Sequence, residues 1–345
     1  MPTEERTGDL VVDSIEECFE RGWTDGLPVV PPTPAGLERM IRASGREPND
    51  VVGILPPKEG LVTVEKVALN ALMAGCKPAY MPVVIAAAEA LTDPRFNIRA
   101  VASSTRGTAP LIVVNGPIRH ELEINCRGNL FGPGWRANAT IGRAIRLLIR
   151  NVGGALPGEL DRATLGHPGK YSYCIGEDEE GSPWEPLHVE RGFRREESVV
   201  TVIGSEAPKQ FGLPQGSAEQ VLDVLADGLR LLTHFSSSGG AEVVVILGNQ
   251  HRDVLSNADY SKKTIRRYLV EKAWRSAAEV RASGSQFLGS AGTVANETRV
   301  YAFKNEDSIH IIAAGDITNR FSAFLQTLRS TSGVAEPVSR VVKGR

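Results

Sequence analysis

The chain has 345 residues, of which 41% are hydrophobic and 23% charged, a composition that fits one large or two ordinary globular domains and excludes wholesale disorder. Its 39 basic and 41 acidic side chains leave a formal net charge of -2, so no overall field attracts it to nucleic acid or to an anionic membrane. The sequence has no apolar run as long as a membrane span and no secretory signal pattern in its first ten residues. Its four cysteines are scattered and form no C-x-x-C pair. Together these features predict a cytoplasmic protein with free thiols.

Residues 1–60 predict a helix followed by an ordered arm. An amphipathic pattern favours a helix over Val11–Glu20. The segment Gly22–Pro34 is too rich in proline and glycine for regular structure, but its tryptophan, leucine and valines indicate a loop that packs on the body. Thr33 is then expected to cap a helix over Pro34–Ser44.

Residues 61–205 predict a first α/β domain, which would carry the functional site. Apolar residues spaced three and four apart favour a helix over Val62–Ala74, capped by Thr63 and ended by Gly75. Further elements are expected as helices over Ala79–Leu91 and Ala139–Arg150 and as strands over Leu111–Val114 and Val199–Ile203. The nearly uniform apolar character of Pro82–Leu91 also makes us expect a homo- or hetero-oligomer.

Residues 206–345 predict a second α/β domain with the same rhythm. The expected elements are helices over Ala218–Leu232 and Thr264–Ser276 and strands over Glu242–Leu247 and Ile309–Ala314. The fold class is therefore α/β, with two similar helix–strand–helix halves around mixed or parallel sheets. Pro110–Gly116 resembles Val243–Asn249 in character, which suggests an internal duplication; chance similarity between two α/β units is the alternative.

A glycine-rich loop that runs into a helix, Asn129–Thr140, predicts an anion site. Free N–H groups at a helix start favour an anion, Arg136 adds a two-pronged guanidinium, and Asn138 is the expected helix cap. Thr140 and Asn115 complete the predicted anion-binding set. The loop fits G-x-G-x-x-A formally, but no strand leads directly into it, and no ATP-binding loop is present; no NAD or ATP motif is therefore assigned, and the cofactor is left unknown.

Cys76 is the first candidate for a reactive thiol. It precedes the predicted helix over Ala79–Leu91 and adjoins Lys77, and both a helix start and a neighbouring cation lower a thiol pKa. A lowered pKa would suit a nucleophile or a redox thiol. A small buried cysteine at a helix junction is the structural alternative.

The irregular stretch Gly166–His188 supplies the remaining catalytic candidates. Cys174 is the second candidate thiol, Glu177 and Glu180 could transfer protons, and His188 could do the same. The alternative for the acidic run is a solvated turn. Cys174, Glu177 and His188 could in principle bind a metal, but no recognised ligand spacing joins them, so no metal is assigned.

Four stretches of residues 15–200 resemble an uncharacterised bacterial family: Gly22–Thr33 (GWTDGLPVVPPT), Met73–Pro78 (MAGCKP), Arg136–Ala144 (RANATIGRA) and Ser182–Leu187 (SPWEPL). That family is found beside UGSC proteins, short selenocysteine or cysteine proteins named for a motif that this chain lacks. The resemblance implies an enzyme subunit that works with a thiol or selenol redox partner. It assigns no catalytic role to any residue, and the second half of the chain departs from the family.

The leading hypothesis is an enzyme, or an enzyme subunit, that cleaves a small anionic metabolite reductively or lytically with the help of a cysteine. A cysteine-dependent amide or nitrile hydrolase is the rival within enzymes. A non-catalytic binding or scaffolding subunit is the alternative from another class.

Overall fold

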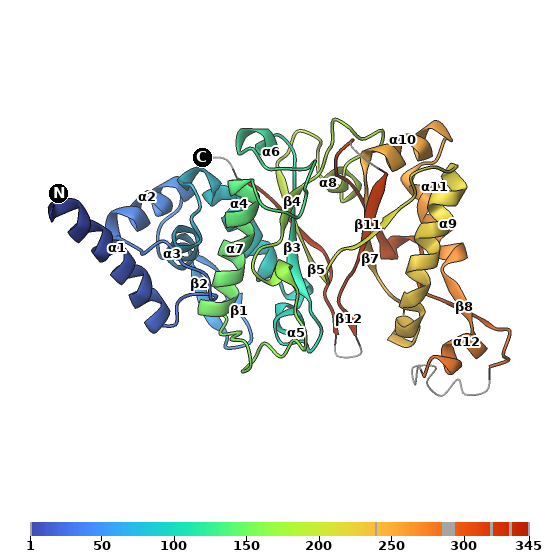
Figure 1. The fold of residues 1–345 in the computed structure, drawn as a ribbon, viewed down its shortest axis with the longest axis horizontal. Coiled ribbons are helices and arrows are strands. Elements are labelled where there is room, and N and C mark those ends of the chain that lie inside the picture. The colour runs from blue at the N-terminus through green and yellow to red at the C-terminus, as the bar shows by residue number, and fades with distance from the viewer. Residues whose placement is uncertain (1, 239, 285–293, 318–319, 331–332, 344–345) are drawn as a thin grey trace.

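The computed structural model describes residues 2–238, 240–284, 294–317, 320–330 and 333–343. These residues form four layers in the order helices, sheet, sheet, helices, as Figure 1 shows from left to right. The predicted α/β class is confirmed, and both central sheets are mixed.

The first sheet has four strands in the order β14 (Val338–Val341), β5 (Val199–Ser205), β3 (Ala109–Asn115) and β4 (Cys174–Gly176). β3 is parallel to β4 and antiparallel to β5, and β14 is antiparallel to β5. β3 and β5 are buried along their whole length, as expected for strands that are covered on both faces.

The second sheet has the order β10 (Ile309–Ala313), β7 (Val243–Leu247), β11 (Phe321–Gln326) and β6 (Lys209–Gly212). β7 is parallel to β10 and antiparallel to β11, and β11 is antiparallel to β6. Both sheets thus have the same sequence of strand directions. The internal duplication nevertheless stays a hypothesis, because strand direction alone does not establish a common origin.

The two halves of the chain are interlocked. β14 comes from the end of the chain but pairs with β5 in the first sheet. The two sheets also share an apolar interior, to which Leu111 and Val113 contribute from one side and Val244 and Ile246 from the other. The division at residues 205 and 206 remains a prediction.

Alternation along the strands explains the layers. Leu111 and Val113 face the other sheet, whereas Ile112 and Val114 face the first helical layer, because successive side chains of a strand point to opposite faces. β7 follows the same rule, with Val245 facing the outer helices and Val244 facing the first sheet. Each large apolar side chain buried in this way stabilises the fold by about 1.5–3 kcal/mol relative to exposure.

The first helical layer consists of α2 (Pro34–Ser44), α3 (Val64–Ala74), α4 (Met81–Leu91) and α7 (Arg136–Asn151). The predicted caps are confirmed: Thr33 accepts a hydrogen bond from the N–H of Gly36, and Thr63 accepts one from Lys66. α4 packs on β5 and β14, so its apolar residues are used within the chain and give no support for the expected oligomer.

The outer layer of the second half consists of α9 (Ala218–Leu229) and α11 (Lys262–Lys272), which pack on each other. The helix predicted to reach Ser276 ends at Lys272, because Trp274–Ser276 forms strand β8 instead. The remaining short elements are α5 (Ile98–Ala102), α6 (Ile118–Glu121), α8 (Leu187–Glu190), α10 (Asn249–Asn257), α12 (Ala277–Ala282), β1 (Val51–Leu55), β2 (Gly60–Thr63), β9 (Arg299–Tyr301), β12 (Arg329–Ser330) and β13 (Gly333–Val334).

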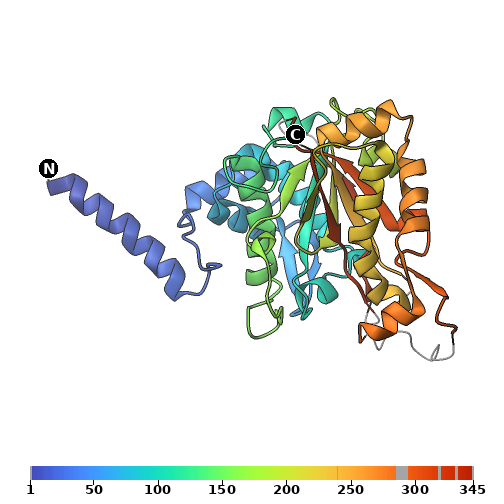
Figure 2. The ribbon, with the colours of Figure 1, turned by 45° about the vertical axis from the view of Figure 1, so that its right-hand side comes forward.

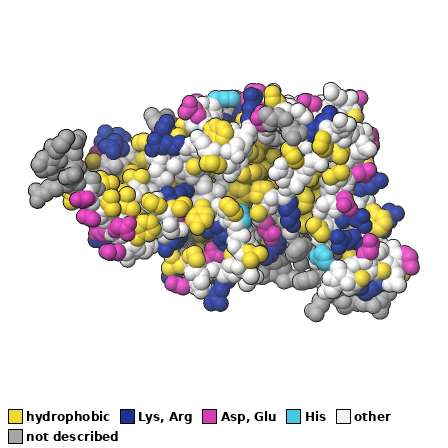
Figure 3. All heavy atoms as spheres, viewed as in Figure 1, with side chains coloured by type: hydrophobic (Ala, Val, Ile, Leu, Met, Phe, Trp, Pro, Cys, Tyr) yellow, Lys and Arg dark blue, Asp and Glu magenta, His cyan; other side chains and the backbone are white. Residues whose placement is uncertain are grey.

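The N-terminal helix α1 (Pro2–Glu20) is longer than predicted and projects from the body (Figure 2). On the described part of the face in Figure 3, basic and acidic side chains are interspersed, in keeping with the near-neutral net charge of -2. Every helix in the described ranges is too short or too polar to cross a lipid bilayer.

Candidate functional site

Cys76 is buried beneath the start of α7, and its predicted activation is wrong. Burial raises the pKa of the Cys76 thiol to about 12, against the smaller lowering effects of a hydrogen bond with Thr140 and of the Arg136 guanidinium. The helix-start argument fails because a 3₁₀ turn over Pro78–Tyr80 separates Cys76 from α4. A thiol in this state is inert in the folded protein.

Cys174 is the first residue of β4 and is also buried. Burial raises the pKa of its thiol, with a smaller contribution in the same direction from Cys76. Its carbonyl accepts a hydrogen bond of 3.1 Å from the Asn138 side chain. Cys174 therefore occupies a packing position in the sheet.

The acidic run that follows β4 is solvated only in part: Glu177 and Asp178 are buried, whereas Glu180 is exposed. Glu177 is fully buried, and its Oε2 accepts hydrogen bonds of 2.7 Å both from the Asn115 side chain and from the backbone N–H of Leu187. Lys262 of α11 lies 3.6 Å from its Oε1. Glu177 and Asn115 thus connect the first sheet to α8 and α11, rather than facing a cavity.

His188 is fully buried as well, with its Nε2 3.4 Å from the carbonyl of Arg195. Cys174, Glu177 and His188 do not assemble into a ligand set, and no group of three or more histidine, cysteine or acidic side chains in the described ranges could hold a metal ion.

Asn138 does not cap α7, because the helix begins two residues earlier and its N-cap is Trp135. Its amide instead bonds the backbone of Asn125 on both sides, at 2.8 and 3.0 Å. Thr140 donates to the carbonyl of Arg136 at 2.8 Å. The predicted anion site at Asn138 is therefore wrong, and neither residue offers a free donor there.

Arg136 does line a cavity, together with Glu180. This Arg136 pocket has a volume of about 610 Å³ and lies between the start of α7 and the segment that follows α6. Its lining consists of Lys77, Tyr80, His120, Leu122, Glu123, Ile124, Asn125, Cys126, Arg127, Gly134, Trp135, Arg136, Ala137 and Glu180. His120 and Cys126 are site residues that the sequence did not reveal.

The Arg136 guanidinium is held in place by the end of α3. Its Nε and Nη2 donate hydrogen bonds of 3.1 and 2.9 Å to the carbonyl of Gly75. Arg127, by contrast, is already paired with Asp178 at 3.2 Å. Among the described residues, Lys77 and Arg136 have no acidic partner within 4.0 Å, so they are the cations available to an anionic ligand.

Glu180 and His120 form an oriented pair at the rim of the pocket. His120 Nε2 lies 2.9 Å from Glu180 Oε1, and its side chain is 64% exposed. Arg119, whose side chain is only 2% exposed, donates hydrogen bonds of 2.8 and 3.3 Å to the two carboxylate oxygens of Glu180. A base oriented by a carboxylate that is itself held in place is the arrangement found around catalytic nucleophiles and bases.

The protonation state of Glu180 follows from these contacts. Burial raises its pKa, but hydrogen bonds from Arg119 and His120 more than offset this and lower the pKa to about 2. Glu180 is therefore ionised at physiological pH and cannot act as a general acid. Any proton transfer by the pair would therefore fall to His120.

This pKa can be measured. We expect the Glu180 carboxyl carbon to titrate near pH 2 in an NMR experiment, and the His120→Gln variant to titrate at a higher pH that is still below the ordinary value of 4.5. Because the folded-state pKa is lowered, the stability that Glu180 provides is present above about pH 4.5 and is lost as the pH falls toward 2. A wild-type midpoint at or above pH 4 would show that the Arg119 contact does not exist in solution.

Cys126 is the remaining chemical group of interest in the Arg136 pocket. It is partly buried, whereas Cys18, Cys76 and Cys174 are buried, and all four are free thiols. Burial raises the pKa of Cys126, and the charge of Asp178 raises it further despite Arg119 and Arg127. Cys126 lines the pocket, but its thiol is not activated.

Comparisons with protein-family models, with curated proteins and with solved structures found no match to this chain.

Proposed function

We propose that this protein is an enzyme, or an enzyme subunit, that binds a small anionic metabolite in the Arg136 pocket and transfers a proton to or from it. The observation that carries the proposal is the His120–Glu180 pair of 2.9 Å at the rim of a pocket that is also lined by Lys77 and Arg136, two cations with no acidic partner in the part of the chain that the structure describes. Arg136 and Lys77 would bind the anion, and His120 would transfer the proton.

Lytic cleavage is the reaction class that these groups support best. In such a step His120 removes a proton from the bound anion, and the electron pair that this releases expels the leaving group. Arg136 and Lys77 would stabilise the negative charge as it develops. Glu180, ionised because its pKa is about 2, would stabilise the imidazolium that forms.

A cysteine-dependent mechanism has less support. The raised pKa values of Cys76 and Cys174 argue against either as the thiol of a reductive cleavage or of an amide or nitrile hydrolase. Cys126 is the thiol that a selenol or thiol partner protein could reach, and this partnership stays a proposal based on the family resemblance. The four free thiols fit the proposed cytoplasmic location.

The test is a binding and turnover screen with 2-hydroxy acids, 2-amino acids and dicarboxylates. We expect Arg136→Gln to weaken binding of a ligand at least tenfold, because the substitution removes a cation that is held in place at the pocket. We expect His120→Gln to retain binding but to slow turnover about 10²–10⁴-fold. Arg42→Gln, an exposed arginine on α2, is the matched control and should change neither quantity.

An enzyme and a non-catalytic subunit give different results. An enzyme should form a product that depends on His120. A binding or scaffolding subunit should show ligand binding that depends on Arg136, without turnover. Unchanged binding and turnover in both variants would remove the Arg136 pocket from consideration.

A further inference from the structure

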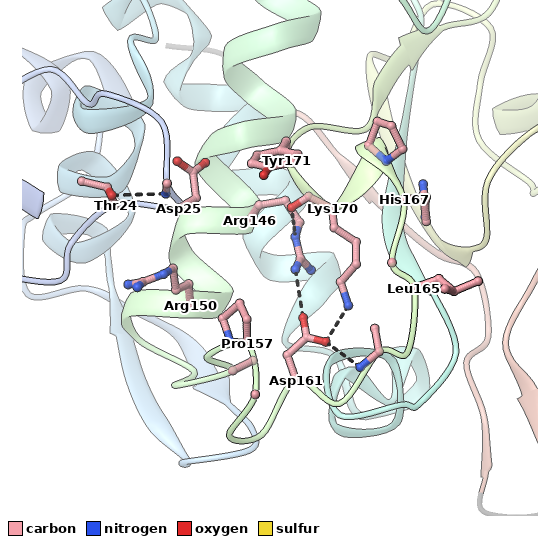
Figure 4. A pocket seen from close by; sticks show the side chains of 16 residues that line it. Thr24, Asp25, Arg146, Arg150, Pro157, Asp161, Leu165, His167, Lys170 and Tyr171 are labelled. Atoms are coloured by element: carbon pink, nitrogen blue, oxygen red, sulfur yellow. Dashed lines mark hydrogen bonds and ion pairs between the residues drawn. The ribbon is translucent and has the colours of Figure 1, made fainter.

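A second and larger cavity lies beside the C-terminal half of α7. This Arg146 pocket has a volume of about 790 Å³ and is formed by the arm around Thr24–Gly26, by α7 and by the loop from Pro157 to Tyr171 (Figure 4). α7 connects the two pockets: Arg136 is its first residue, and Arg146 lies ten residues later, about 15 Å along the helix.

Arg146 is the central residue of this pocket. Its side chain is only 9% exposed, its Nε donates to the carbonyl of Lys170 at 2.9 Å, and its Nη2 lies 3.7 Å from Asp161. Its Nη1 is buried and has no hydrogen-bond partner among the described residues. A buried guanidinium nitrogen without a partner is costly, and an anion in the adjoining cavity would remove that cost.

The charges around Arg146 are unbalanced. Lys170 Nζ bonds Asp161 at 2.6 Å, so Arg146 and Lys170 share one carboxylate, as Figure 4 shows. Arg150 also lines the pocket and binds the carbonyl of Gly22, but has no acidic partner within 4.0 Å among the described residues.

Asp25, the second carboxylate that lines the pocket, does not offset the excess of positive charge. Asp25 is engaged by both Arg143 Nε and Arg143 Nη2, at 2.9 and 2.7 Å, and Arg143 itself lies outside the pocket lining. Once this pair is set aside, three cations face one carboxylate. Burial lowers the pKa of Arg146 and also that of Arg150, which is only partly buried.

We infer that the Arg146 pocket is a second binding site, specific for a small dianion such as a dicarboxylate or a phosphate. The excess of two positive charges matches a dianion. One oxygen of the dianion would accept the Nη1–H of Arg146, for which the described ranges hold no partner. The site lies where the arm docks on α7, so the ligand joins the two segments. The inference does not depend on the function proposed for the Arg136 pocket.

The test is isothermal titration of the full-length protein at low salt with malonate, inorganic phosphate and acetate. We expect the dianions malonate and phosphate to bind at least tenfold more tightly than acetate. Arg146→Met should weaken malonate binding at least tenfold, and Arg150→Gln should weaken it severalfold. The second variant keeps the test decisive if the first does not fold, because its position is more exposed than that of Arg146.

Arg42→Gln, whose guanidinium is exposed on α2, is the matched control and should leave malonate binding unchanged. Arg136→Gln separates the two pockets, because it removes only binding to the Arg136 pocket. If malonate binding is lost only in Arg136→Gln, or if Arg146→Met and Arg150→Gln bind malonate as the wild type does, the second site does not exist. Absence of dianion binding to the wild type would overturn it equally. Failure of the Arg136 pocket to bind any ligand, by contrast, affects only the proposed function.

Discussion

Replacing Arg252 with methionine is expected to destabilise the folded protein by about 3–5 kcal/mol, the largest stability effect we predict for a single side chain. Arg252 is fully buried in α10, and its Nη2 donates a hydrogen bond of 2.8 Å to Asp178 Oδ2. Asp178 is itself buried, and its backbone N–H bonds the carbonyl of Ala313 at 2.7 Å. The substitution would leave a buried carboxylate whose one other ion pair among the described residues, with Arg127 at 3.2 Å, lies toward the surface.

Urea denaturation followed by circular dichroism measures this loss. The double variant Arg252→Met with Asp178→Asn should recover part of it, because the buried charge is removed together with its partner. Arg42→Met provides the control, since its pair with Glu38 on α2 is exposed and should contribute less than about 1 kcal/mol. A loss below 1 kcal/mol in the Arg252 variant would mean that the second half does not depend on this ion pair.

Local sequence signals predict some elements of the fold, whereas elements that depend on distant partners, like the Arg252–Asp178 pair, cannot be predicted from them. Helices such as α2 and α3 were predicted closely because their apolar periodicity and their threonine caps are local signals. β14 was missed because it is short and finds its partner β5 across more than a hundred residues of chain. β4 was missed because it has only three residues.

The candidate site shows the same limit. Arg136 and Glu180 were predicted and line one pocket, because a glycine-rich helix entry and an acidic run are visible in the sequence. His120 and Cys126 lie in an irregular segment without periodicity, and only the three-dimensional structure brings them to Arg136. The one available signal was the dense sequence of charged and polar residues from Arg119 to Arg127, which follows a predicted strand.

Burial explains why the predicted activation of the cysteines is wrong. A neighbouring lysine and a helix start are visible in the sequence, but the desolvation that outweighs them at Cys76 depends on how α7 packs over it. The proposed proton-transfer role of Glu177 has no support for the same reason. The sequence does not show that this residue is buried, but hydrogen bonds from Asn115 and Leu187 hold its carboxylate inside the protein.

The remaining prediction decides which thiol can take part in chemistry. In the folded protein we expect iodoacetamide to alkylate Cys126 at least a hundredfold faster than Cys76 or Cys174, because the last two are buried and must wait for local opening. The rate at Cys126 should still increase above pH 9, since burial and then the charge of Asp178 raise its pKa. Peptide mass spectrometry at successive times measures each rate.

Two controls make the outcome unambiguous. All four cysteines should react at similar rates in denaturant, and Cys126→Ser should abolish the fast reaction in the folded protein. A ligand that protects Cys126 in wild type but not in Arg136→Gln would place that ligand beside both side chains. If Cys76 were instead to react rapidly at neutral pH, the packing of α7 over it would have to open readily, and the cysteine-dependent mechanism first suggested by the sequence would regain its support.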